Sequence, residues 1–181
     1  MERSPVFKDK NIVIGICACS PAIKTLDLIG ELRERGAEVD VIMTPNSVNF
    51  VSPLMVQREA KRPVQIEAFE LPKMYDPNHK SLSQKADLLI LAPVSANTLG
   101  KAANGIADNL LSTTIMSTKA PIVAAMHINP MMYSNPSVQR NIKQLKEDGF
   151  IFVDNGNEEN PSKFPTISQI SSTVEQILNQ I

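Results

Sequence analysis

The sequence is poor in the residues that mark several functional classes. It holds 2 cysteines, 2 histidines and no tryptophan among 181 residues, and its formal net charge at pH 7 is -1. Cysteines and histidines that are so few and so far apart make a poor set of zinc ligands, because zinc sites need a full ligand set at characteristic spacings. We therefore expect no metal site. Charges of both signs are scattered, which provides no basic field for nucleic acid.

Long apolar runs are missing too. No stretch approaches the roughly 20 apolar residues that a membrane-spanning helix needs, and residues 1–5 lack the apolar core of a signal peptide. These absences predict a cytoplasmic protein that binds neither a membrane nor nucleic acid. Cys17 and Cys19 lie two residues apart in an apolar run, where a mutual disulfide would be strained, so we expect reduced thiols.

The patterns that are present predict a single α/β domain over residues 1–181. A chain of this length with 43% hydrophobic residues has the size of one ordinary domain. Short apolar runs predict strands at 11–17, 39–43, 87–91, 121–125 and 150–153, with helical stretches between most of them. This alternation favours a Rossmann-like, three-layer α/β sandwich with a mainly parallel sheet in the flavodoxin-like order.

Several helix boundaries can be predicted as well. Ser20 is expected to cap a helix that Pro21 opens and Gly36 ends. Further helices are expected at 95–104, at 108–118 with Asp108 at its start, at 136–149 and at 167–181. The span 61–78 holds three prolines and is predicted to be a surface excursion.

Open parallel sheets bind ligands beyond the carboxyl ends of their strands, so the residues after each predicted strand are the candidates for a site. After the first strand, Cys19 and Ser20 precede a helix whose N-terminus can receive a phosphate, although a capped structural turn explains them equally well. The loop lacks the glycine patterns of dinucleotide and triphosphate sites. After the second strand, Thr44 and Ser47 can bind phosphate oxygens or simply cap the next helix.

The residues after the third strand, Ala92–Thr98, form a third candidate segment. Small residues there let the backbone approach a flat ligand, while Ser95, Asn97 and Thr98 offer hydrogen bonds. The alternative is a tight connection to a helix with Ser95 as its cap. A fourth candidate segment, 129–136, follows the next strand and combines amides, prolines and an aromatic residue.

These segments resemble the flavoprotein family of cysteine decarboxylases, which includes phosphopantothenoylcysteine decarboxylase and the epidermin and mersacidin peptide decarboxylases. Ala92–Thr98 resembles the family's Pro-Ala-Ser-Ala-Asn-Thr flavin loop, and 103–111 resembles the segment that follows it. The resemblance covers nearly the whole chain and implies FMN as cofactor and a homotrimer or higher homo-oligomer. The flavin-binding residues that it implies are Cys19, Ser20, Thr44, Ser47, Pro93, Ser95, Ala96, Asn97, Thr98 and Asp108.

The resemblance extends to a substrate site. Asn129, Met132 and Tyr133 fit the family's Pro-x-Met-Asn-x-x-Met-Trp motif, whose asparagine contacts the substrate carboxylate. The fit is incomplete, because Met126-His127-Ile128 replaces Pro-x-Met and Tyr133 replaces tryptophan. A shift of two residues in the alignment would place His127 rather than Asn129 at the substrate. We prefer Asn129.

The implied reaction is an FMN-dependent oxidative decarboxylation of a terminal cysteine or cysteinyl compound, either a peptide or a phosphopantothenoylcysteine-like thiol. His79 matches the family's active-site histidine and would act as acid or base, with an exposed loop histidine as the alternative. No cysteine follows Cys19, whereas the coenzyme A branch carries a reducing cysteine in its C-terminal third. Other possibilities are a flavin reductase or electron-transfer flavoprotein, a more remote flavin prenyltransferase, and a non-catalytic regulatory flavoprotein.

Overall fold

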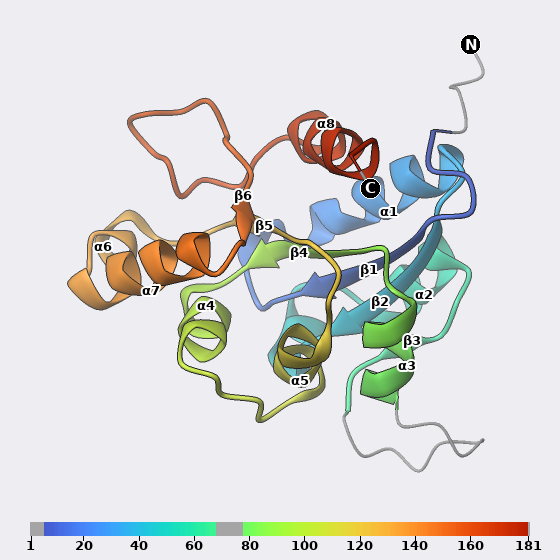
Figure 1. The fold of residues 1–181 in the computed structure, drawn as a ribbon, viewed down its shortest axis with the longest axis horizontal. Coiled ribbons are helices and arrows are strands. Elements are labelled where there is room, and N and C mark those ends of the chain that lie inside the picture. The colour runs from blue at the N-terminus through green and yellow to red at the C-terminus, as the bar shows by residue number, and fades with distance from the viewer. Residues whose placement is uncertain (1–5, 68–77, 181) are drawn as a thin grey trace.

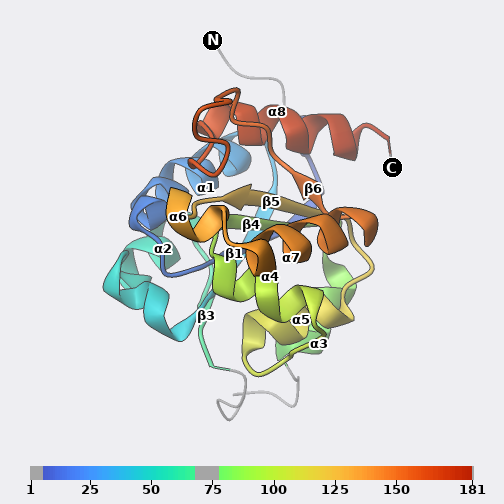
Figure 2. The same cartoon turned by 90° about the vertical axis from the view of Figure 1, so that its left-hand side faces the viewer.

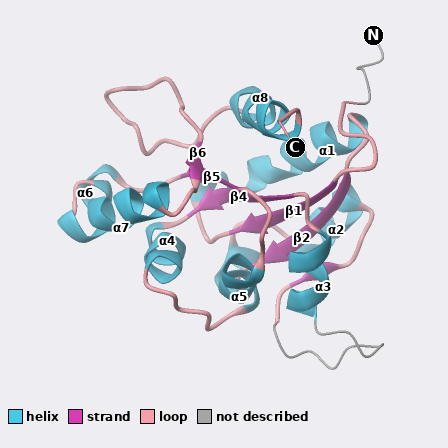
Figure 3. Cartoon of the chain, in the orientation of Figure 1, coloured by secondary structure: helices cyan, strands magenta, loops and turns pink. Residues whose placement is uncertain are grey.

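A parallel sheet forms the centre of the computed structural model, which describes residues 6–67 and 78–180 and, within these ranges, the side chains of all but 78–81 (Figures 1 and 3). The strand order is β3-β2-β1-β4-β5-β6, and every pair of neighbours is parallel. The strands are β1 (Asn11–Ile16), β2 (Glu38–Met43), β3 (Val64–Gln65), β4 (Leu88–Val94), β5 (Ile122–Met126) and β6 (Ile151–Phe152).

Helices cover both faces of this sheet, which makes three layers (Figure 2). One face packs against α1, α2 and α8, and the other packs against α3, α4, α5 and α7. The helices are η1 (Ser20–Lys24), α1 (Thr25–Glu34), η2 (Pro45–Asn49), α2 (Pro53–Ala60), α3 (Asn78–Lys85), α4 (Ala96–Ala103), α5 (Leu110–Ser117), α6 (Pro130–Tyr133), α7 (Pro136–Glu147) and α8 (Ile167–Leu178).

The central strand β1 explains how the core is divided. Ile12 and Ile14 pack into the layer under α1 and α8, while Val13 packs into the opposite layer, and all three side chains are fully buried. Successive residues of a strand point to opposite faces, so an uninterrupted apolar run suits a strand that is covered on both sides. The prediction of a central first strand and of the α/β class is confirmed.

Beyond shifts of a few residues in the bounds of the elements, three predictions differ from the structure. The strand β3 lies inside 61–78, where the sequence suggested only a surface excursion; a two-residue edge strand next to Pro63 leaves little pattern to detect. Ser20 is the first residue of η1 rather than its cap, and Cys19 occupies the cap position without a side-chain hydrogen bond. Asn109, not Asp108, caps α5 through a reciprocal pair of hydrogen bonds with Ser112.

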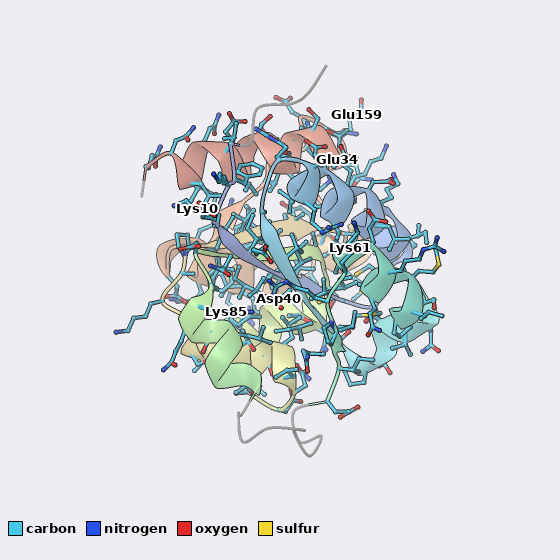
Figure 4. All side chains as sticks on the ribbon, turned by 90° about the vertical axis from the view of Figure 1, so that its right-hand side faces the viewer. Lys10, Glu34, Asp40, Lys61, Lys85 and Glu159 are labelled. Carbon is cyan, nitrogen blue, oxygen red and sulfur yellow. The ribbon has the colours of Figure 1, made fainter. Side chains whose placement is uncertain are left out.

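A charge cluster joins α3 to the sheet. Asp40 on β2 is almost buried, and its carboxylate lies 2.5 Å from the ammonium of Lys85 at the end of α3. The guanidinium of Arg62 approaches the same carboxylate to 3.6 Å. Figure 4 shows Lys85 beside Asp40. The last turn of α3 is therefore held against β2, just before the chain enters β4.

Candidate functional site

A cleft of about 430 Å³ lies beyond the carboxyl ends of β1, β4 and β5. The chain leaves β1 toward β2 on one side and leaves β4 toward β5 on the other, so the loops at this point diverge, as they do where open α/β sheets bind ligands. The described residues that line the cleft are Ala18, Cys19, Ser20, Phe50, Ser95, Ala96, Asn97, His127, Ile128, Asn129, Pro130, Met132, Asn160 and Lys163.

The loop after β4 presents part of its length to the cleft and anchors itself with the rest. Ser95 caps α4 by accepting a hydrogen bond from the backbone of Thr98 at 3.3 Å. The hydroxyl of Thr98 is buried and lies 3.1 Å from the sulfur of Cys17, and the Cys17 amide donates to the carbonyl of Pro93 at 3.0 Å. The predicted residues Pro93 and Thr98 thus hold the loop to β1, whereas Ser95, Ala96 and Asn97 line the cleft.

The loop after β1 contributes two of the predicted residues, Cys19 and Ser20. Both cysteines of the chain are free thiols, as expected. Burial, and to a lesser extent the neighbouring Cys17 thiol, raise the pKa of Cys19 to about 12. Burial also raises the pKa of Cys17. Both groups are therefore protonated at neutral pH and are poor nucleophiles, because the thiolate is the reactive form.

His127 lies at the end of β5 and lines the same cleft. Its backbone N–H donates to the carbonyl of Val94 at 3.1 Å, and its Nε2 lies 3.1 Å from the hydroxyl of Ser20. Burial, and then the positive charge of Lys24, lower the pKa of the imidazole. His127 is therefore a neutral imidazole at pH 7, and its buried Nδ1 has no hydrogen-bond partner among the described residues.

Asn129 lines the cleft two residues further on. Its side-chain oxygen accepts from the backbone of Met131 at 2.9 Å and so caps the short helix α6. This contact fixes the amide and leaves its NH₂ group without a partner among the described residues. Met132 also lines the cleft, whereas Tyr133 is half-buried and packs on the apolar layer under α4 and α7.

Two further segments reach the cleft that the sequence did not indicate. Asn160 and Lys163 come from the stretch between β6 and α8. That stretch is bound to the loop after β5, because the Ile128 amide donates to the Ser162 carbonyl at 3.1 Å and the buried Ser162 hydroxyl donates back to the Ile128 carbonyl at 2.7 Å. Phe50, directly after η2, forms another wall. The polar, turn-rich composition of 154–165 does not predict this contact.

The other predicted residues lie elsewhere. The hydroxyl of Ser47 is buried and donates to the carbonyl of Thr44 at 2.7 Å, and neither residue is among those that line the cleft. Asp108 is exposed and forms an ion pair with Lys101 at 2.7 Å, which lowers the pKa of the carboxyl through a hydrogen bond. His79 belongs to the first turn of α3, and its side chain lies outside the described residues.

In the described ranges 6–67 and 78–180, no group of three or more histidine, cysteine, aspartate or glutamate side chains is placed to hold a metal ion. Among the helices of these ranges, none has the length and apolar character needed to cross a membrane.

The curated relatives of the chain are longer proteins. The coenzyme A biosynthesis bifunctional protein CoaBC of Bacillus subtilis is 36% identical over 149 residues, which cover 82% of this chain and 37% of the relative. CoaBC of Escherichia coli is 34% identical over 142 residues, covering 78% and 35% respectively. The chain thus spans little more than a third of the length of these relatives.

Solved structures match over nearly the whole chain. The FMN-dependent cysteine decarboxylase SpaF has a TM-score of 0.84 and 30% identity, covering 95% of this chain and 97% of that one. A cysteine-to-serine mutant of PPC decarboxylase has a TM-score of 0.81 and 30% identity, covering 96% and 100%. The peptidyl-cysteine decarboxylase EpiD has a TM-score of 0.75 and 28% identity, covering 91% and 98%. The family model described as Flavoprotein matches residues 3–179, so the chain belongs to the flavoprotein family.

Proposed function

We propose that this chain is an FMN-dependent oxidative decarboxylase that acts on a terminal cysteine or a cysteinyl compound. The observation that carries the proposal is the cleft at the divergence of β1 and β4, which brings the Ser95–Asn97 loop and Asn129 to one site. SpaF, EpiD and PPC decarboxylase, which are similar to nearly the whole chain, are described as decarboxylases, and SpaF as FMN-dependent.

The residues of the cleft fit FMN. Its volume of about 430 Å³ falls within the roughly 300–1,000 Å³ typical of ligand pockets. Ala18 and Ala96 carry the smallest side chains on its walls and leave room for a flat ring. Among the described residues that line the cleft, Lys163 carries a positive charge and none carries a carboxylate. This charge favours a ligand with an anionic phosphate. The hydroxyls of Ser20 and Ser95 and the amide of Asn97 supply hydrogen bonds.

Asn129 is the residue that we assign to the substrate carboxylate. Its side-chain oxygen accepts from the Met131 backbone, which fixes the amide, and its NH₂ group supplies two donors that suit a carboxylate oxygen. A fixed amide also costs less rotational freedom on binding than a mobile one. His79 is proposed as the acid or base, on a helix whose other end is held by the ion pair of Lys85 with Asp40.

The cofactor supplies the oxidising power. Bound FMN would supply a two-electron oxidant for the cysteine side chain of the substrate, which is the chemistry that provides an electron sink for loss of carbon dioxide. Residues 20–181 hold no cysteine, and the Cys19 thiol in the cleft is protonated at neutral pH because its pKa is raised to about 12. We therefore propose that an unsaturated thiol product leaves without being reduced by the protein.

We also propose that the chain assembles as a homotrimer or a higher homo-oligomer. Several large apolar side chains are exposed, and contiguous patches of such side chains are uncommon on the surface of a monomer. They come from η1, η2 and α2, and from the residue after η2 that also lines the cleft: Ile23, Val48, Phe50, Leu54 and Met55. Light scattering coupled to gel filtration measures the mass directly, and a monomer at micromolar concentration contradicts the proposal.

The decisive test combines spectroscopy with mass spectrometry. The purified protein loaded with FMN is mixed anaerobically with peptides that end in cysteine and with phosphopantothenoylcysteine. We expect flavin bleaching together with loss of carbon dioxide and two hydrogens from the substrate, and no such loss with His79→Asn, which keeps its flavin. Bleaching by reduced nicotinamide alone would instead indicate a flavin reductase, and a loaded protein that reacts with none of these a regulatory role.

A further inference from the structure

A hydrogen-bonded pair of side chains crosses the carboxyl end of β4. Ser20 follows β1 and His127 follows β5, and these strands flank β4 in the sheet. The Ser20 hydroxyl and the Nε2 of His127 are 3.1 Å apart, and both residues line the cleft. The contact therefore links the two outer loops of the site, on either side of the loop that begins at Ser95.

The surroundings of His127 are neutral or positive. Lys24 of η1 acts on the imidazole electrostatically, and Lys163 lines the same cleft from the stretch before α8. The thiol of Cys19, which approaches the His127 carbonyl at 3.7 Å, is uncharged at neutral pH. No aspartate or glutamate occurs among the described residues that line the cleft. A protonated His127 consequently has no counter-ion in the lining and would gain one from an anionic ligand.

The geometry points to a role for His127 that is separate from the assignments of His79 and Asn129. We propose that His127 is a positioning residue: its Nε2–H donates to Ser20, so that the Ser20 hydroxyl donates to an oxyanion of the bound ligand, and His127 takes up a proton when that oxyanion binds. The oxyanion is the FMN phosphate or the substrate carboxylate. This inference rests on the proposed flavin function.

The two ring nitrogens explain the coupling to pH. A neutral imidazole carries one N–H, and the tautomer protonated at Nε2 leaves Nδ1 as a buried acceptor without a partner in the described residues, which costs less than a buried unpaired N–H. In the charged form both nitrogens donate, so Nε2 can only donate to Ser20. Protonation therefore locks the Ser20 hydroxyl in the orientation that serves an anion, and affinity for the anion rises as pH falls.

The test compares dissociation constants of wild type and His127→Gln between pH 8 and pH 5.5. Flavin fluorescence measures the binding of FMN and of riboflavin, which lacks the phosphate. At each pH, the dissociation constant of His127→Gln is divided by that of the wild type, which cancels the ionisation of the ligand itself. We expect this ratio for FMN to rise about tenfold as the pH falls from 8 to 5.5, in line with the gain when a hydrogen bond becomes charge-assisted. The ratio for riboflavin should stay constant. Met131→Gln, an exposed change in the same loop, is the matched control and should leave both ratios at one.

A second arm identifies a carboxylate as the source. A peptide that ends in serine, which cannot be oxidised at sulfur, is titrated as free carboxylate and as amide into the FMN-loaded protein. A pH-dependent ratio for the carboxylate alone supports the proposal with the substrate as the oxyanion. Constant ratios in both arms, or equal slopes for FMN and riboflavin, overturn it while leaving the flavin function intact. A wild type that binds neither flavin removes the proposed function and this inference together.

Discussion

Thr98 shows the difference between residues that hold the flavin loop in place and residues that would touch the ligand. Its side chain is 4% exposed, is not among those that line the cleft, and contacts Cys17 at 3.1 Å and Ser95 at 3.3 Å. Thr98→Val keeps the shape of the side chain but removes the hydroxyl from both contacts. A typical hydrogen bond contributes about 0.5–1.5 kcal/mol, and the contact to sulfur is a weak one. We expect the free energy of unfolding to fall by about 1 kcal/mol in total.

Two assays measure the effect. Thermal unfolding should shift by about 2–4 °C, the change expected for 1 kcal/mol in a domain of this size, and FMN affinity should fall only a few-fold, since the backbone contact between Thr98 and Ser95 is retained. Asn97→Ala, in contrast, removes an exposed amide that lines the cleft, so it should weaken FMN binding about tenfold and leave stability unchanged. A hundredfold loss of FMN affinity in Thr98→Val at unchanged stability would refute this division of roles.

Three other predictions concern the surroundings of the site. Asp40→Asn removes the charge that Lys85 pairs with at 2.5 Å and should lower the free energy of unfolding by about 1–2 kcal/mol; an unchanged urea midpoint contradicts this. Ser162→Ala deletes the buried hydrogen bond to the Ile128 carbonyl, so it should lower the free energy of unfolding by about 1 kcal/mol and raise the KM for substrate. An unaltered KM would show that the two loops act independently. The native pKa of His127 is lowered from 6.5, so stability without ligand should fall as pH drops below about 6.5, and His127→Gln should lose this part of the slope in pH-dependent urea titrations.

Much of the fold could be predicted because the strands are buried on both faces. The run Asn11–Ile16 contains no polar residue after its first position, and only a strand covered by helices on each side tolerates that pattern. The positions of the main loops then follow, because parallel strands bring their carboxyl ends to one edge. This is why Ser20, Ser95 and Asn129, which are distant in sequence, were expected together and are found together.

The rest of the site depends on contacts that local patterns do not encode. Lys163 reaches the cleft because Ser162 and Ile128 exchange two hydrogen bonds across 34 positions of sequence. The roles of short polar residues were equally hidden, since a serine or threonine that binds a ligand and one that satisfies the backbone look alike in the sequence. Ser47 and Thr98 prove to have their hydroxyls engaged within the protein, while Ser95 both caps a helix and lines the cleft.

The most direct test is whether FMN binds in this particular cleft. Ala96 has the smallest side chain of the flavin loop's lining residues and lies half-buried at the edge of the apolar layer under α4, so Ala96→Trp would fill the space that a flat ring requires. Equilibrium titration followed by flavin fluorescence should show one FMN bound per wild-type chain and at least a hundredfold weaker binding to Ala96→Trp at similar thermal stability. A wild type that binds no FMN, or a variant that binds it as tightly as the wild type, would contradict the assignment.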